Sequence, residues 1–105
     1  VKKVDRLFYD GYVPMAEKEI GRIVETAKNK FGVEDIQVLH RTGWLDIGDI
    51  AVSIVVSSEH RRESLDACRF VIDEIKKKVP IWKKEIYTDG SSEWVLTCST
   101  QETEL

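Results

Sequence analysis

The feature of this sequence that most constrains its fold is an apolar repeat between Arg61 and Lys77, which predicts a long helix. At about 100° per residue, six side chains fall on one stripe that would face a core: Leu65, Cys68, Val71, Ile72, Ile75 and Val79. Glu74 and Lys77 are expected to point away from that stripe. Pro80 stops the helix, because proline has no backbone N–H and clashes with the preceding turn.

A second helix is predicted from Pro14 to Phe31. Proline suits the first turn of a helix, where its missing N–H costs no hydrogen bond. Apolar residues then recur at intervals of three and four: Ala16, Ile20, Ile23, Ala27 and Phe31. Lys28 and Lys30 lie in the last turn, and Gly32 is well placed to end the helix.

The remaining chain contains strand-like runs, several of them rich in β-branched residues. They lie at residues 4–9, 36–39, 50–56, 86–87 and 94–96, with a short Trp-Leu-Asp-Ile element between Gly43 and Gly48. Residues 89–92, Asp-Gly-Ser-Ser, predict a hairpin between the last two runs. Together these elements predict an α+β fold, with two main helices packed on a mostly antiparallel sheet.

At 105 residues the chain is long enough for one domain, which we place at residues 1–98, followed by a polar C-terminal tail at 99–105. No apolar run approaches the roughly 20 residues that span a bilayer, and the first residues contain no signal-peptide core. The two cysteines, Cys68 and Cys98, form neither a CxxC pair nor part of a metal-ligand cluster. We therefore expect a cytoplasmic protein without a metal or cofactor, in which Cys68 is a buried thiol.

Positive charge is concentrated in one part of the chain. Between His60 and Lys84 there are eight basic and four acidic residues, whereas the remainder carries eight basic and fifteen acidic residues. The segment therefore has a charge of +4 in a protein whose net charge is −3. Such a concentration indicates a local anion site, since scattered charge would serve only solubility. The alternative is that the lysines at 76–78 form a solvated basic face.

Lys76 lies just beyond the edge of the apolar stripe, next to Leu65 and Ile72 in projection. Partial desolvation at that place would favour the neutral amine and make it available as a nucleophile or base. In the other interpretation, the stem of Lys76 covers the core while its charged head stays in water. Helix position alone favours this second interpretation.

His60 and Arg61 follow a predicted strand and open the helix, where backbone N–H groups favour an anion. An arginine there makes bidentate contacts with phosphate or carboxylate, and a histidine can donate a hydrogen bond or a proton. Taken alone, such a pair is more often surface than site. The dipeptide recurs at His40 and Arg41, for which we favour a structural role.

A Pro-Ile-Trp-Lys-Lys-Glu run follows the helix. Trp82 is predicted to anchor this segment as a loop, so that Lys83 and Lys84 project from it. Glu85 could neutralise one of these lysines and hold its orientation. Basic residues without interleaved aromatic residues, on an acidic protein, support nucleic-acid binding only weakly, and we expect neither nucleic acid nor a membrane as partner.

Many of these residues recur together, with the same spacing, in one known family. The matching positions are His40-Arg41-x-Gly43, Ile47-Gly48-Asp49, Ala51-Val52, Ser57-Ser58-x-His60-Arg61, Ala67-Cys68, Ile72-Asp73, Lys76, Pro80-x-Trp82-Lys83-Lys84-Glu85, Asp89-Gly90 and Trp94-Val95. Over nearly its whole length the chain resembles the large, catalytic subunit of molybdopterin synthase. The resemblance implies the α/β hammerhead fold of that subunit.

The resemblance also implies a sulfurtransferase of molybdenum cofactor biosynthesis. Family members form a homodimer with one small ubiquitin-like subunit at each end, which makes a heterotetramer. The small subunit carries a thiocarboxylate on its C-terminal Gly-Gly tail. Sulfur from this tail converts cyclic pyranopterin monophosphate to molybdopterin in two rounds.

By the same resemblance, Lys76 and Lys83 are the catalytic lysines. His60 and Arg61 match the pair that reaches the pocket of the neighbouring protomer. The expected substrate-binding residues are His60, Arg61, Lys76, Lys83 and Glu85. We assign Arg61 and Lys83 to holding phosphate, and Lys76 to moving a proton or stabilising charge on sulfur and carboxylate.

Two departures from the family leave other functions open. Relatives begin with a few dozen further residues that include an arginine of the anion pocket, and they carry a basic residue near the position of Cys98. The main alternative is a non-catalytic dimeric binding module that docks the Gly-Gly tail of the small subunit without turnover. A generic phosphate- or nucleotide-binding domain is the third alternative.

Overall fold

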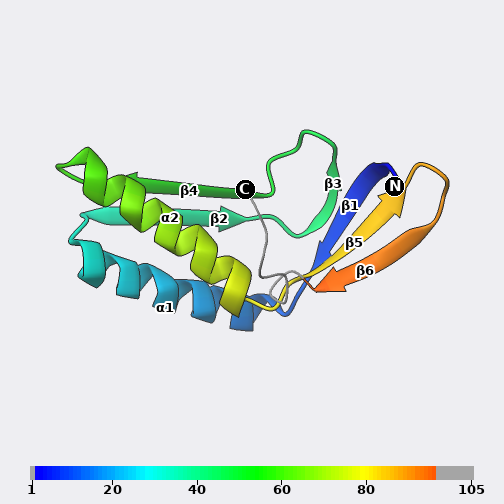
Figure 1. Cartoon of the computed structure of the whole chain (residues 1–105). Helices are drawn as coiled ribbons and strands as arrows, with labels where there is room; N and C mark the ends of the chain where they lie inside the picture. Colours follow the sequence, from blue (N-terminus) through cyan, green and yellow to red (C-terminus); the bar gives the residue numbers. More distant parts are fainter. Residues whose placement is uncertain (1, 97–105) are drawn as a thin grey trace.

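The computed structural model describes residues 2–96 of the chain, and its elements confirm the predicted α+β class (Figure 1). In chain order the elements are β1 (Val4–Asp10), α1 (Val13–Phe31), β2 (Asp35–His40), β3 (Gly43–Asp46), β4 (Val52–Ser57), α2 (Arg61–Lys78), β5 (Trp82–Tyr87) and β6 (Ser92–Leu96). Within the described residues, neither helix is long and apolar enough to cross a membrane. Cys98 and the predicted tail at 99–105 lie outside the described residues, so the domain boundary at residue 98 stays a prediction.

The ends of the helices follow from the residues at their termini. Pro14 occupies the first turn of α1, as predicted. Gly32 ends α1 with a φ of 66°, a left-handed conformation that glycine adopts without steric strain. Its N–H donates to the carbonyl of Lys28 at 2.9 Å, which satisfies one of the last carbonyls of the helix. At the end of α2, Val79 is already extended ahead of Pro80.

Both helices pack on one face of a two-stranded antiparallel sheet formed by β2 and β4 (Figure 1). Side chains alternate along these strands, so that Ile36 is buried against the helices while Leu39 and Val55 are 74% and 55% exposed. The core lies between the helices and this sheet. Its buried members are Ile23, Ala27, Val33, Ile36, Ala67, Val71, Ile75, Val79 and Ile81.

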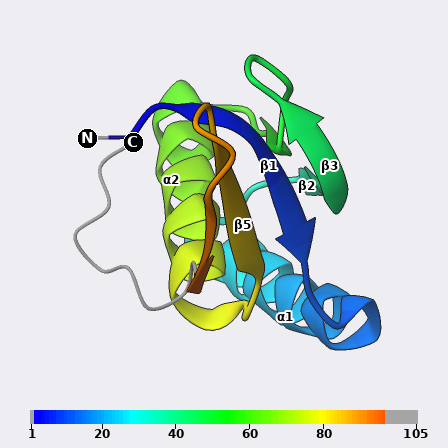
Figure 2. The same ribbon diagram turned by 90° about the vertical axis from the view of Figure 1, so that its right-hand side faces the viewer.

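A separate four-stranded antiparallel sheet, in the order β3–β1–β5–β6, projects beyond the helices (Figures 1 and 2). The division of the strands between two sheets was not apparent from the sequence. The chain enters the second sheet at Gly43, where φ is 90°, and turns back toward the first at Gly48, where φ is 94°. Because side chains rarely tolerate these angles, the two glycines allow β3 to cross to the other sheet and back.

The buried face of α2 differs from the stripe predicted from the sequence. Ala67, Val71 and Ile75 are buried, whereas Leu65 is 63% exposed. The prediction for Leu65 was wrong, because the stripe was drawn through large apolar side chains. The face that packs against α1 and β4 is instead centred near a fully buried alanine, whose small side chain permits close packing. Cys68, predicted to be buried, is half-buried.

Glu74 faces the neighbouring helix, so the prediction that it points away was also wrong. Its side chain is only 15% exposed, and its Oε1 lies 2.8 Å from Lys78 Nζ. Together with Arg22 and Ile23 of α1 it lines a small cavity between the helices. The carboxylate can occupy this place because Lys78, one turn further on, supplies the opposite charge.

Candidate functional site

The candidate site is built on one face of β5, where side chains two residues apart point the same way. Lys83 and Glu85 therefore lie side by side, with Lys83 Nζ 3.4 Å from Glu85 Oε2. The two side chains are 27% and 23% exposed. The expected pairing of Glu85 with a lysine is present, and its partner is Lys83. The pair presents an oriented ammonium group at a partly desolvated surface, which suits an anionic ligand.

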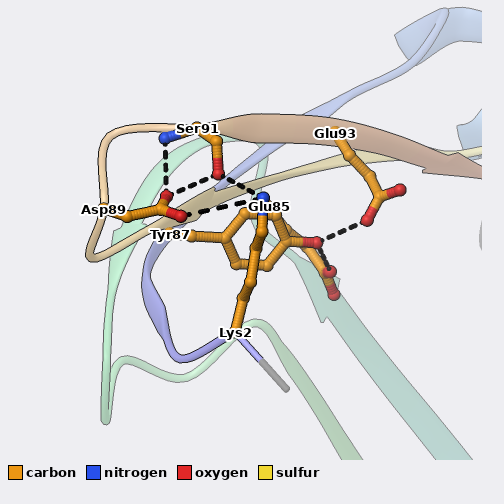
Figure 3. A network of polar contacts seen from close by, with 6 residues as sticks. All are labelled: Lys2, Glu85, Tyr87, Asp89, Ser91 and Glu93. Carbon is orange, nitrogen blue, oxygen red and sulfur yellow. Dashed lines mark hydrogen bonds and ion pairs between the residues drawn. The ribbon is translucent and has the colours of Figure 1, made fainter.

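Tyr87, two residues beyond Glu85, connects this pair to the neighbouring strand (Figure 3). Its hydroxyl oxygen lies 2.8 Å from Glu85 Oε1 and 2.7 Å from Glu93 Oε2. Glu93 comes from β6, where the antiparallel register places it directly opposite Glu85. The hydrogen bonds with Glu93 and then Glu85 raise the pKa of Tyr87 far above the ordinary tyrosine value, so its phenol stays protonated at neutral pH.

The sequence did not single out Tyr87 or Glu93 as site residues. A strand was predicted only at residues 86–87, which left Lys83 and Glu85 in a loop. Had the strand been extended back to residue 82, alternation would have placed residues 83, 85 and 87 on one face. The hairpin turn would then have set Glu93 opposite Glu85.

The turn that follows β5, at residues 89–91, lies beside the ring of Tyr87 together with Lys2 (Figure 3). Lys2 Nζ lies 5.5 Å from the centre of that ring, donates to Ser91 Oγ at 2.9 Å and sits 3.7 Å from Asp89 Oδ2. The Ser91 hydroxyl and backbone N–H both donate to Asp89, which lowers the pKa of that carboxyl. Only 8% of Tyr87 is exposed, so the ring is fixed by its surroundings.

Tyr9 lies directly across from Lys83 in the register of β1 and β5. Burial raises the pKa of its phenol, and the charge of Glu85 raises it further. The ring makes an edge contact with His40, with centroids 5.6 Å apart. His40 Nδ1 lies 2.9 Å from the carbonyl oxygen of Arg41, so this nitrogen donates its hydrogen there. These contacts support the structural role expected for His40.

Lys76 stands in the last turn of α2, at the end of the helix that leads into β5 (Figure 1). It is half-buried, whereas Lys77 is exposed. Around the helix, Lys76 lies about 140° from Val71 of the buried face and close to Leu65 and Ile72, as predicted. Its half-buried side chain fits both the desolvated and the solvent-reaching interpretation.

His60 and Arg61 stand at the opposite end of α2 (Figure 1). Both are exposed, and His60 is the N-cap residue, with no hydrogen bond from its side chain to the helix. Because α2 runs unbroken to Lys78, Arg61 and Lys76 are roughly 22 Å apart along its axis, at about 1.5 Å per residue. Within one chain, the structure does not bring His60 and Arg61 to Lys76.

The other face of β5 carries aromatic and cationic side chains. Trp94 and Phe8 make an edge contact, with ring centroids 6.4 Å apart, and Lys84 Nζ lies 5.6 Å from the centre of the Trp94 ring. Trp82 is the first residue of β5 and is 46% exposed, so the prediction that it anchors a loop was wrong. As neighbours on a strand, Lys83 and Lys84 point to opposite faces of the sheet.

One groove among the described residues has a volume of about 440 Å³ and runs between α1 and the end of β2. Its walls are mostly apolar and include Val13, Ile20, Val24 and Val38, and none of the five predicted site residues lines it. Within residues 2–96, no group of three or more His, Cys, Asp or Glu side chains is arranged to hold a metal ion.

Known proteins are similar to this chain in both sequence and fold. Residues 1–78 match the family described as MoaE protein. A molybdopterin synthase catalytic subunit from Dictyostelium discoideum is 47% identical over 102 residues, which cover 94% of this chain and 65% of the relative. The Homo sapiens protein of the same description is 47% identical over 91 residues, which cover 87% of this chain and 48% of the relative.

Solved structures of similar proteins share the fold of this chain. The crystal structure of molybdopterin synthase from Staphylococcus aureus superposes with a TM-score of 0.85 at 44% identity, covering 90% of this chain and 68% of the other. A Helicobacter pylori complex of subunits 1 and 2 of molybdopterin-converting factor shares the fold, with a TM-score of 0.67 at 22% identity over 90% of this chain and 61% of the other. The chain spans 65%, 45% and 63% of the length of the relatives from Dictyostelium discoideum, Arabidopsis thaliana and Pyrococcus abyssi.

Proposed function

The chain belongs to the MoaE protein family, and from this membership we propose that it acts as the catalytic subunit of a molybdopterin synthase. In the proposed reaction, sulfur passes from the thiocarboxylated Gly-Gly tail of a small ubiquitin-like subunit to cyclic pyranopterin monophosphate, which becomes molybdopterin. The observation that carries the proposal is the identity of nearly half of the residues, over most of the chain, with relatives named for that activity.

Lys83 holds the cyclic phosphate in this proposal. Its ammonium group is already oriented by Glu85 at 3.4 Å, so less side-chain freedom is lost when the substrate binds. Partial desolvation strengthens the attraction between this ammonium and a phosphate. The cost is that the phosphate must compete with Glu85, which makes the strength of the Lys83–Glu85 contact a determinant of substrate affinity.

Lys76 supports the transfer of sulfur itself. In each transfer the carbon–sulfur bond of the tail breaks, water supplies the oxygen of the carboxylate that remains, and negative charge is present on sulfur and on the acyl oxygen during the reaction. A half-buried ammonium in the last turn of α2 can stabilise that charge or donate a proton to it. Lys77, exposed on the next position of the helix, serves as the natural comparison.

A second copy of the chain completes the pocket. Arg61 is roughly 22 Å from Lys76 along α2, which is beyond the reach of two side chains that grip one phosphate. The neighbouring protomer therefore presents its own His60 and Arg61 to the lysines of the first. A two-fold homodimer does this twice, so each dimer has two equivalent pockets and binds two small subunits.

A turnover assay tests the proposed function. The chain is mixed with a thiocarboxylated small subunit and cyclic pyranopterin monophosphate, and the dithiolene product is measured. We expect product with the thiocarboxylated subunit and none with its carboxylate form. A chain that binds both ligands yet yields no product would instead be the non-catalytic dimeric module, which is the second candidate.

We further propose that the reaction takes place in the cytoplasm. The free thiol of Cys68, which is half-buried, is consistent with a reducing compartment. Cell fractionation of the native protein tests this location, and recovery in an oxidising compartment would contradict it.

A further inference from the structure

We propose that Tyr87 and Glu93 are positioning residues that set how tightly Glu85 holds Lys83. The inference rests on the proposed function, since it concerns the same lysine. It follows from one geometric fact, that a single phenol oxygen lies within 2.8 Å of two carboxylates on adjacent strands. Neither Tyr87 nor Glu93 contacts the substrate in this scheme; both act through Glu85.

The two contacts of the Tyr87 hydroxyl, with Glu85 and with Glu93, share a single hydrogen. Both oxygen–oxygen distances, 2.8 Å and 2.7 Å, are typical of hydrogen bonds, and each such bond needs a hydrogen between its oxygens. When Glu85 and Glu93 are both ionised, the hydroxyl of Tyr87 supplies the only one. The hydrogen therefore points to Glu85 or to Glu93, and the two carboxylates compete for it.

The direction of this hydrogen changes the charge that Lys83 meets. When Tyr87 donates to Glu85, part of the negative charge of Glu85 is already engaged, so its attraction for Lys83 weakens. When Tyr87 donates to Glu93, Glu85 pairs fully with Lys83. Glu93 thus affects the Glu85–Lys83 contact without touching Lys83. A phosphate competes more easily for Lys83 when Tyr87 donates to Glu85.

The surrounding structure holds the Tyr87 ring between the two carboxylates. The ring of Tyr87 is buried, and Lys2 covers it while bound to the turn at Asp89 and Ser91. Glu85 and Glu93 are direct partners in the register of two paired strands, which fixes their separation. The titratable groups on the same face of the sheet as Lys83 are Tyr9 on β1, Glu85 and Tyr87 on β5, and Glu93 on β6, and Lys2 lies over the Tyr87 ring.

The test measures the reactivity of Lys83 toward an amine-acylating reagent as a function of pH, by peptide mass spectrometry of the full chain. Tyr87→Phe removes the donor, so Glu85 should hold Lys83 more tightly and the pH of half-maximal reactivity should rise, on the order of half a unit. Glu93→Gln replaces the competing carboxylate with a neutral amide oxygen, which is a weaker acceptor, so Tyr87 donates more fully to Glu85 and the same midpoint should fall. Glu93 is exposed, so its substitution should leave the fold intact, which circular dichroism checks.

A double variant separates action through Tyr87 from a direct effect of the Glu93 charge. In the Tyr87→Phe background, Glu93→Gln should leave the midpoint where Tyr87→Phe alone put it. Glu25→Gln, which removes an exposed carboxylate of α1 that makes none of these contacts, is the matched control and should leave the wild-type midpoint unchanged. Shifts in the same direction for both single variants, or no shift, would overturn the proposal.

Synthase kinetics add a readout that depends on the proposed function. The Michaelis constant for the cyclic phosphate should rise in Tyr87→Phe and fall in Glu93→Gln, with smaller changes in the turnover number. Opposite midpoint shifts without any synthase activity would support the positioning role and count against the proposed function. Activity with unchanged Michaelis constants in both variants would support the function and count against the positioning role.

Discussion

Arg61 and Lys76 occupy opposite ends of one unbroken helix, roughly 22 Å apart along its axis. Lys76 stands at the end that leads into β5 and the Lys83–Glu85 pair, whereas Arg61 opens the helix at the far side of the core (Figure 1). If all of these residues act on one substrate, they must come from two chains.

Lys76→Ala should abolish sulfur transfer without unfolding the protein. Loss of one positioned acid–base group typically lowers a rate by about 10²–10⁴. Lys77→Ala should be nearly silent, because Lys77 is exposed on the neighbouring position. Rates of dithiolene formation, with circular dichroism as the check on folding, give the comparison. Equal damage from the two substitutions would indicate a diffuse basic face.

Removal of the last two residues of the small subunit should weaken its complex with this chain markedly. In the proposed pocket its terminal anion lies beside Lys76 and Lys83, so the truncated tail loses both charge contacts. Added salt should weaken the intact complex too, since exposed charges are screened over roughly 10 Å at 0.1 M. Calorimetry that finds the same affinity for the truncated subunit would contradict this placement of the tail.

Val71→Ala should destabilise the protein far more than Leu65→Ala. Val71 is fully buried in the core, so the loss of its methyl groups leaves a cavity and costs about 2 kcal/mol. Leu65 is 63% exposed, and its truncation should change stability by less than about 0.5 kcal/mol. Urea denaturation measures both. In the full assembly, a large effect of Leu65→Ala on dimer formation alone would show that this side of α2 is covered by another chain.

Stability should decline at alkaline pH because of Tyr87 and Tyr9. The pKa of each phenol is raised in the folded protein above the ordinary value of about 10. The stabilisation is therefore fully present below about pH 10 and is lost as the pH rises through the folded-state values. Denaturation at about pH 8 and about pH 11 should show a smaller alkaline loss for Tyr87→Phe than for the unaltered chain. An equal loss would contradict the raised pKa of Tyr87.

The sequence predicted those parts of the fold that depend on local chemistry. Pro14, Gly32 and Pro80 set the helix ends through backbone geometry, which is a property of the residues themselves. The buried face of α2 was misplaced because it depends on which elements lie beside it. There a small residue, Ala67, marks the closest contact, and hydrophobic patterning gives little weight to alanine.

The sequence predicted the charged residues of the candidate site but not the hydrogen bonds that join them to Tyr87 and Glu93. The basic run and the partner Glu85 are visible in the sequence, since adjacent charges of opposite sign need no tertiary structure to be noticed. The Tyr87–Glu93 contact depends on the register of β5 and β6. The strand predicted at residues 86–87 was shorter than β5, so this register could not be predicted. The separation of Arg61 from Lys76 followed from helix length alone, which is why it could be predicted.

Subunit mixing tests the shared pocket most directly. An Arg61→Ala chain and a Lys76→Ala chain, each inactive alone, are mixed and given time to exchange protomers, and dithiolene formation is then measured. A heterodimer has one pocket with both residues and one with neither, so it should show about half of the normal activity, or about a quarter for a randomly exchanged mixture. A mixture that exchanges protomers yet stays as inactive as each variant alone would contradict a pocket built from two chains.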